Sequence, residues 1–126
     1  MIDCAHNPAG FEVLKNELKI IKNKKKIKGF IFIIGIQDTK DIMNMLKKIN
    51  PLISKIIFTK SKNEKAAEPS ELLHILNKIN KNKSIKTRII KNPKKALNYA
   101  KKIADKKDLV VVTGSIYMVG DLLKQI

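Results

Sequence analysis

Apolar residues follow two alternating patterns along this chain. Short runs of β-branched and aromatic residues predict strands at 30–34, 55–59 and 109–113, with a shorter strand at 85–90. The runs at 30–34 and 109–113 are continuously apolar, which is typical of strands buried on both faces. Between these runs, apolar residues recur at helical spacing over about 10–24, 42–49, 72–79, 93–104 and 119–126. In the closing helix, the residues expected to face the core are Val119, Leu122, Leu123 and Ile126.

Strands that alternate with helices predict right-handed β-α-β crossovers and a mainly parallel sheet covered on both faces. The expected fold class is therefore α/β, in the form of a Rossmann-like three-layer αβα sandwich. Asn92 followed by Pro93 predicts the start of the fourth helix, because asparagine caps helices and proline suits their first position. A length of 126 residues fits one domain.

The sequence lacks membrane and secretion features. No apolar run approaches the ~20 residues that a bilayer-spanning helix needs. The segment from Met1 to His6 has neither the basic nor the apolar region of a secretory signal. The single cysteine, Cys4, cannot form an internal disulfide. Together these features predict a cytoplasmic protein.

The charge is strongly basic, with 27 lysines and arginines against 11 acidic residues and a net charge of +16. Such a balance favours a polyanionic partner if the basic side chains cluster on one surface. However, the lysines are spread along the whole chain, and Arg88 is the only arginine. Aromatic residues are also few. We therefore interpret the lysines as a solvated coat and expect no nucleic-acid partner, with a stand-alone basic module as the alternative.

Ligands of open α/β sheets bind beyond the carboxyl ends of the strands, which directs attention to three segments. If Met1 to Asp3 ends a strand, Asp3 and His6 lie at that edge. Asp3 could accept hydrogen bonds from a ribose or an adenine amine, and His6 could pair with a carboxylate or be satisfied by the backbone. Asn7, followed by Pro8, is expected to cap the next helix.

The other two segments follow the strands at 30–34 and 109–113. After the first, Asp38 or Thr39 could cap the next helix, and Lys40 could approach a nucleotide phosphate. After the second, Gly114 would allow close approach of a ligand. Ser115 would either simply cap the last helix or, with free N–H groups at its start, bind an anion.

Several familiar sites are missing from the sequence. There is no GxxxxGK[ST] phosphate loop and no GxGxxG after a strand. His6, His74 and Cys4 do not make a zinc site, and His74 is expected at the surface. No catalytic nucleophile and no metal site are predicted within the chain.

Together, the three segments resemble the ordered motifs of the folylpolyglutamate synthase family. They read D-C-A-H-N-P at 3–8, G-I-Q-D-T-K-D at 35–41 and V-T-G-S-I-Y-M-V-G at 112–120. The resemblance covers essentially the whole chain and is to the family's C-terminal domain, which Mur ligases share. The final motif favours the folate branch over the peptidoglycan branch. Cys4 replaces the glycine usual in the first motif.

The resemblance implies an ATP-dependent ligase that adds glutamate to the γ-carboxylate of a folate through an acyl phosphate. By analogy, Asp3 and Lys40 would contact ATP, while His6, Asn7 and Ser115 would bind glutamate. Residues 1–126 would be the Mur ligase-type C-terminal domain of a monomeric enzyme. The P-loop and the Mg²⁺ ligands would belong to an ATPase domain absent from this chain, so the chain alone is expected to be inactive. A Mur-type ligase domain with a different acceptor or amino acid is a further alternative.

Overall fold

A four-stranded parallel sheet forms the middle layer of the fold. The computed structural model describes residues 1–81 and 85–125. The strand order is β3-β2-β1-β4, and each pair of neighbours is parallel. The strands span Gly29–Gly35 (β1), Ile53–Phe58 (β2), Lys86–Ile89 (β3) and Asp108–Gly114 (β4). Each predicted strand is confirmed, and the sheet is parallel throughout these strands rather than only mainly so.

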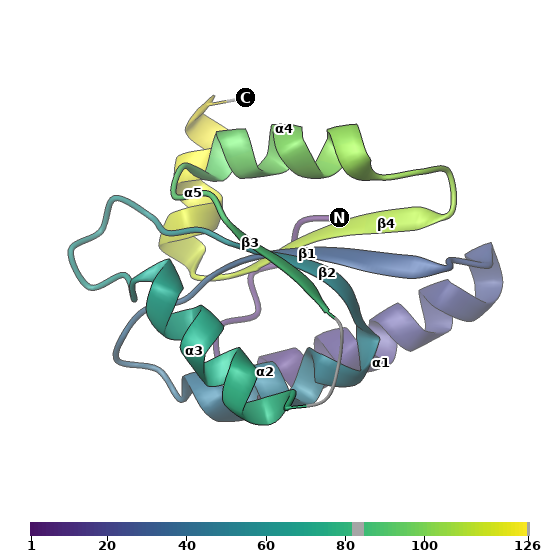
Figure 1. Cartoon of the computed structure of the whole chain (residues 1–126), viewed down its shortest axis with the longest axis horizontal. Helices are drawn as coiled ribbons and strands as arrows, with labels where there is room; N and C mark the ends of the chain where they lie inside the picture. The colour runs from purple at the N-terminus through teal and green to yellow at the C-terminus, as the bar shows by residue number, and fades with distance from the viewer. Residues whose placement is uncertain (82–84, 126) are drawn as a thin grey trace.

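Helices cover both faces of the sheet. They span Pro8–Lys25 (α1), Ile42–Ile49 (α2), Pro69–Ile79 (α3), Pro93–Ile103 (α4) and Ile116–Gln125 (α5), and a short 3-10 turn (η1) covers Asn50–Leu52. Figure 1 shows α4 and α5 above the sheet and the other three helices below it. The predicted three-layer αβα sandwich is therefore confirmed.

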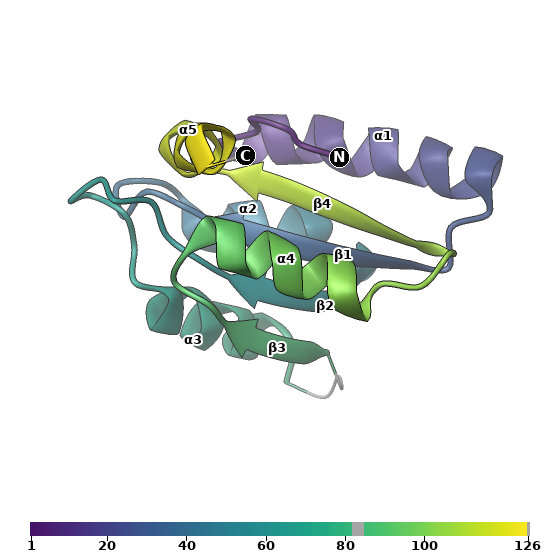
Figure 2. The same ribbon diagram turned by 90° about the horizontal axis from the view of Figure 1, so that it is seen from above.

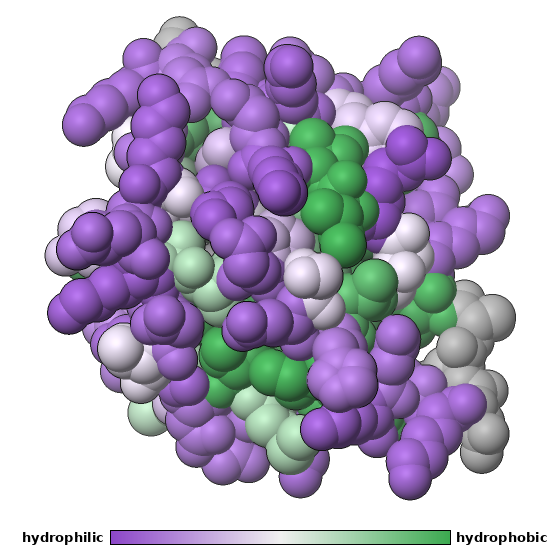
Figure 3. Space-filling model, turned by 60° about the vertical axis from the view of Figure 1, so that its left-hand side comes forward, coloured by the Kyte–Doolittle hydropathy of each residue, from purple (hydrophilic) through white to green (hydrophobic). Residues whose placement is uncertain are grey.

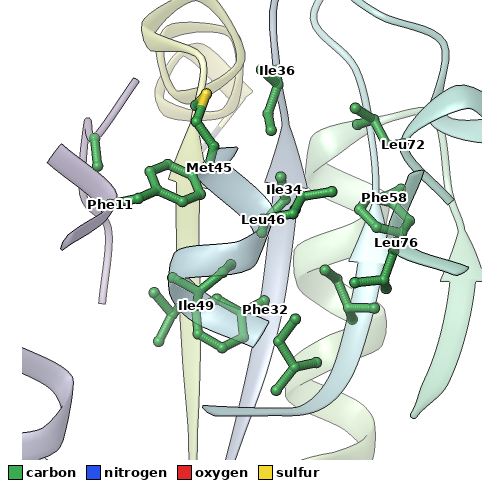
Figure 4. Packing of buried hydrophobic residues seen from close by; sticks show 14 of the residues in the cluster. Phe11, Phe32, Ile34, Ile36, Met45, Leu46, Ile49, Phe58, Leu72 and Leu76 are labelled. Carbon is green, nitrogen blue, oxygen red and sulfur yellow. The ribbon is translucent and has the colours of Figure 1, made fainter. Parts of the chain in front are cut away.

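The central strand β1 is buried along its whole length and separates two apolar cores. Phe32 and Ile34 point into the larger core, where α1, α2 and α3 supply most of the other side chains (Figure 4). Ile31 and Ile33 point into the smaller core beneath α4 and α5. Full burial of such a side chain contributes roughly 1.5–3 kcal/mol, so this continuous apolar strand holds both helical layers to the sheet.

The first three residues run beside β4 as a short extension of the sheet. Ile2 forms a parallel bridge with Val112. The N–H of Asp3 donates to the carbonyl of Val112 (2.9 Å), and the N–H of Val112 donates to the carbonyl of Met1 (2.8 Å). As expected, Asp3 therefore ends an extended segment at the edge where β4 also ends. Figure 2 shows the N-terminal segment beside β4.

Helix caps are partly as expected. The side chain of Asn7 accepts from the N–H of Gly10 at the start of α1, and that of Asn92 accepts from the N–H of Lys95 at the start of α4. The prediction for α2 was wrong, because its cap is Asp41. The reason is a turn before the helix, in which the N–H of Lys40 donates to the carbonyl of Gln37 and delays the helix start.

The prediction for the core face of α5 was partly wrong. Met118, Val119 and Leu122 are buried, whereas Leu123 is 52% exposed. A helix turns by about 100° per residue, so a stripe set by Met118 and Leu122 leaves Leu123 on the outside. Ile126 lies outside the described residues.

Two further observations concern the surface. His74 is exposed on α3, as expected. Among the helices of the described residues, none is both long and apolar enough to cross a membrane.

Candidate functional site

A cavity of about 310 Å³ opens at the carboxyl ends of β1 and β4; we name it the strand-end cavity. This volume falls within the range of about 300–1,000 Å³ typical of ligand pockets. Figure 3 turns the side of the molecule that carries α5 toward the viewer, and apolar groups lie there between polar ones. The cavity is lined by His6, Ile36, Gln37, Thr39, Lys40, Met45, Gly114, Ser115, Ile116 and Tyr117.

Gly114 lines the strand-end cavity at a point where it lies against a second glycine. Gly35 and Gly114 are paired at the ends of β1 and β4. Gly114 has a φ of +118°, and a Cβ there would lie 2.2 Å from the carbonyl oxygen of Gly35. The chain can therefore turn from β4 into α5 at this point only with glycine at position 114. This turn places Ser115 directly at the rim.

Ser115 caps helix α5 with its side chain. Its Oγ accepts from the N–H of Tyr117 (3.1 Å) and of Met118 (3.4 Å), and the residue is 3% exposed. The capping interpretation is thus confirmed, and two of the N–H groups expected to be free are occupied. A hydroxyl with both lone pairs engaged still has its own proton to donate. Ser115 can therefore present a donor to an anion in the cavity.

His6 is exposed on the loop that follows the first extended segment. Its Nδ1 lies 3.0 Å from the carbonyl oxygen of Cys4, so Nδ1 must carry a proton for this contact to be a hydrogen bond. One ring nitrogen of His6 is therefore hydrogen-bonded to the backbone, which was one of the two interpretations of this residue. Nε2 can accept from a ligand, or donate to a carboxylate when the ring is doubly protonated.

Lys40 and Gln37, on the loop after β1, also line the cavity. Lys40 is exposed and brings a positive charge. Gln37 is 9% exposed, and its Nε2 donates to the Oδ1 of Asn63 (3.4 Å). Among the described residues, the Oε1 of Gln37 has no hydrogen-bond partner although it is buried. Sequence reasoning missed Gln37, because its isolation follows only from how the loops pack.

Two of the expected site residues do not line the cavity. Asp3 is half-buried, and its Oδ1 accepts from the N–H of Ala5 (2.7 Å). The Oδ1 of Asn7 is taken by the N–H of Gly10 (2.7 Å). The structure therefore brings together His6, Lys40 and Ser115 from three distant segments, and leaves Asp3 and Asn7 beside them with local roles.

The charges around the strand-end cavity suit an anion. Its lining, which lies wholly within the described part of the chain, contains a lysine and a histidine but no aspartate or glutamate. The start of α5 adds the positive end of a helix dipole. Within residues 1–81 and 85–125, no three His, Cys, Asp or Glu side chains gather as they would around a metal ion.

A parallel sheet between two helical layers, with a cavity at its strand ends, defines an α/β domain of the Rossmann-like class. Residues 1–125 match the family model described as the C-terminal domain of dihydrofolate synthetase. The chain belongs to this family. The expected resemblance is confirmed.

Individual relatives extend the comparison. The chain is 34% identical over 114 residues to the UDP-N-acetylmuramoyl-L-alanyl-D-glutamate–2,6-diaminopimelate ligase of Buchnera aphidicola subsp. Baizongia pistaciae, covering 90% of this chain and 22% of that protein. Among solved structures, E. coli FolC in complex with ADP has a TM-score of 0.84 at 22% identity, covering 98% of this chain and 28% of FolC.

Folylpolyglutamate synthase from Thermotoga maritima has a TM-score of 0.76 at 27% identity, covering 97% of this chain and 26% of that chain. The chain thus spans about a quarter of the length of the relatives it matches. The comparisons therefore concern one domain of proteins that are considerably longer.

Proposed function

We propose that this chain is the amino-acid-positioning domain of an ATP-dependent ligase that joins glutamate to the γ-carboxylate of a folate. The observation that carries the proposal is the convergence of His6, Lys40 and Ser115 on one cavity without acidic lining. These residues come from three separate segments, and each is of a type that binds anions. Membership of the dihydrofolate synthetase family supports a ligase of the folate type.

The incoming glutamate has two carboxylates and one amine to be placed. The Ser115 hydroxyl and the protonated His6 ring would hold a carboxylate. The buried Oε1 of Gln37, which has no partner among the described residues, would accept from the amine. An acceptor left without a partner costs about 1–3 kcal/mol, so a ligand that supplies a donor there gains that energy. This arrangement fixes the direction in which the amine points.

The domain's part in the reaction is positioning. ATP, when bound, supplies the phosphoryl group that activates the acceptor carboxylate as an acyl phosphate. The cavity residues hold the attacking amine in place and keep water away. A bimolecular reaction step thereby becomes effectively unimolecular. Lys40 would pair with a nucleotide phosphate, and the second carboxylate oxygen of Asp3 would accept from the ribose or the adenine. Asn7 would orient the loop that carries His6.

We propose that most of the residues that bind the phosphates of ATP belong to another domain. Residues 1–126 contain no phosphate-loop motif, so an ATPase domain would provide the P-loop and hold Mg²⁺, in a monomeric enzyme. Ligation with a tetrahydrofolate, ATP and radiolabelled glutamate should give no product with the 126-residue chain by itself. Measurable turnover by this chain would contradict the proposal that a second domain is required.

A diaminopimelate-adding ligase is the second candidate, because the Buchnera relative is 34% identical and is named for that amino acid. Diaminopimelate is two carbons longer than glutamate and carries a second ammonium group beside its far carboxylate. The lining of the strand-end cavity contains no aspartate or glutamate, so no carboxylate there forms an ion pair with a second ammonium group. On this ground we propose glutamate as the amino acid.

The direct test is a titration of the ¹⁵N-labelled chain with L-glutamate and, separately, with meso-diaminopimelate, followed by NMR. Glutamate should shift the amide signals of residues 35–40 and 114–117, and diaminopimelate should shift them less at equal concentration. The variants Ser115→Ala and His6→Ala should each weaken glutamate binding. Ser70→Ala and His74→Ala remove the same groups from exposed positions on α3 and should not.

Two results would contradict the proposal. Stronger binding of diaminopimelate would favour the Mur-type activity. Glutamate binding that the His6 and Ser115 variants leave unchanged would remove the cavity from the mechanism.

A further inference from the structure

A second cavity, of about 410 Å³, lies on the opposite half of the sheet from the site described above; we name it the β3-side cavity. Its floor is formed by β2 and β3, and its wall by Tyr99 and Ile103 of α4. Figure 2 shows the reason: α4 lies over the middle of the sheet and leaves β3 uncovered on this face. Nothing in the proposed ligase function uses this region.

Three cations converge on the floor of this cavity. Lys55 of β2 is directly opposite Lys86 of β3, and Ile57 is opposite Arg88. Because side chains alternate along a strand, Lys86 and Arg88 share one face. Neighbouring strands are about 5 Å apart, and residues two apart along a strand are about 7 Å apart. The backbone positions of Lys55, Lys86 and Arg88 therefore form a compact triangle on one face of the sheet.

Among the described residues, no acidic side chain forms an ion pair with these three cations. The lining of the β3-side cavity, all within the described residues, includes no aspartate or glutamate. The ion pairs found in the described part of the chain involve Glu12 and Glu68, and none of the three cations takes part in them. Like charges directly opposite each other on neighbouring strands are unfavourable. A bound anion would remove this repulsion.

Arg88 differs from the other cations in kind and in constraint. It is the only arginine in the sequence, and its guanidinium carbon lies 4.5 Å from the centre of the Tyr99 ring. This cation–π contact restrains the guanidinium group against the ring. A held guanidinium fork matches the oxygens of a phosphate group in a way that a flexible ammonium cannot.

We propose that the β3-side cavity binds a compact multiply charged phosphate, with Arg88 as the geometric anchor and Lys55 and Lys86 as neutralising charges. The shared chemistry is a chain of phosphoryl groups, as in an inorganic oligophosphate or in the tail of a nucleoside triphosphate. A concave cavity with three closely rooted cations favours such a small dense anion over the extended backbone of a nucleic acid.

The test is calorimetric and NMR titration of the 126-residue chain at fixed salt with inorganic phosphate, pyrophosphate, tripolyphosphate and ATP. We expect one-to-one binding that strengthens from phosphate to tripolyphosphate, with signal shifts centred on residues 55–57, 86–88 and 99. ATP that binds as tightly as tripolyphosphate would identify an oligophosphate site. ATP that binds more tightly would identify a nucleotide site. Both results support the proposal.

Variants separate geometry from charge. Arg88→Gln should weaken tripolyphosphate binding by about tenfold, the scale of one charge-assisted hydrogen-bonded contact. Arg88→Lys keeps the charge but should still weaken binding by about threefold, because the fork is lost. Tyr99→Leu should weaken binding by releasing the guanidinium group, and Tyr99→Phe should retain it. Lys47→Gln removes one exposed charge from α2, on the other face of the sheet, and should have little effect.

Three outcomes would overturn the proposal. Equal weakening by Lys47→Gln and Arg88→Gln would mean that only the overall charge matters. Signal shifts confined to the strand-end cavity would place the anion there instead. A single-stranded oligonucleotide that binds more tightly than tripolyphosphate, with affinity that rises with its length, would identify a nucleic-acid surface. Thermal melting of each variant checks that it is folded.

Discussion

The backbone N–H of Ser115 donates a hydrogen bond of 2.6 Å to the carbonyl oxygen of Gly35. This bond joins the residue after β4 to the last residue of β1, one step beyond the regular pairing of the two strands. It holds the start of α5 against the end of the central strand. This part of the lining of the strand-end cavity is therefore fixed, and the Ser115 hydroxyl has a fixed position on its rim.

Substitution at Gly114 should damage this junction severely. In Gly114→Ala, the new Cβ would meet the Gly35 carbonyl oxygen at 2.2 Å, in a backbone conformation with φ of +118°. We expect a loss of at least about 3 kcal/mol in the free energy of unfolding, measured by urea denaturation.

Gly120 in the middle of α5 is the matched control. A Cβ there meets nothing within 4 Å, so Gly120→Ala should stabilise the protein by about 0.5–1 kcal/mol through helix propensity. Equal effects of the two substitutions would mean that the junction at Gly114 is not as tight as described.

Removal of the Ser115 hydroxyl should affect stability and binding separately. Ser115→Ala leaves the N–H groups of Tyr117 and Met118 without their acceptor, which should cost about 1 kcal/mol in urea denaturation. Ser115→Asn retains a capping side chain and should recover most of that stability.

Glutamate binding tests the second role of the same residue. If the hydroxyl also donates to a carboxylate, Ser115→Ala should weaken binding by about tenfold while the protein remains folded. Stability lost without any loss of binding would restrict Ser115 to capping.

The Glu68–Lys60 ion pair should make a pH-dependent contribution to stability. The Lys60 ammonium donates a hydrogen bond to Glu68, and this holds the pKa of that carboxyl below its ordinary value. A lowered pKa in the folded state stabilises the fold above the ordinary carboxyl pKa of about 4.3, and the effect disappears as the pH falls through the lower value.

Thermal melting can test this contribution. Glu68→Gln should lower the melting temperature slightly at pH 7, and the difference from the unmodified chain should shrink as the pH falls toward 3. Glu17→Gln removes the same charge from an exposed site on α1 outside the ion pairs of the described residues. If both substitutions have the same pH profile, the cause is net charge alone.

Truncation of the central strand should be costly. Phe32 is 0% exposed, and Phe32→Ala should lower the free energy of unfolding by about 3–5 kcal/mol. Val13→Ala on α1, at a site that is 60% exposed, should change it by less than about 0.5 kcal/mol. Urea denaturation of both variants checks the difference. A small effect of Phe32→Ala would mean that the core of α1, α2 and α3 can collapse around the lost ring.

Much of the fold could be predicted from local pattern. The run Phe30–Ile34 leaves a strand no polar face, so it has to lie in the centre of a parallel sheet with helices on both sides. Asn7 and Asn92, each followed by proline, fix helix starts by local hydrogen bonding alone. The cap of α2 was not predicted correctly, because several polar residues there could serve as the cap. Which of them does so depends on a turn in which the N–H of Asp38 donates to the carbonyl of Lys65.

The candidate site was predictable only in part. His6, Lys40 and Ser115 stood out because polar residues directly follow apolar strands. The isolated Oε1 of Gln37 did not, because it depends on how that loop packs against the segment around Asn63. The β3-side cavity was equally hidden, since the sequence counts charges but does not say which of them face one another.

Local patterns in the sequence were enough to predict the elements, their order and the segments at the carboxyl edge, because hydrophobic periodicity and capping act over a few residues. Three-dimensional packing was needed to show that His6 and Ser115 share one cavity and that Asp3 and Asn7 stay outside its lining. The same holds for the contact of Arg88 with the Tyr99 ring. These relationships join residues far apart in the chain. They exist only once packing has fixed the distances between the layers.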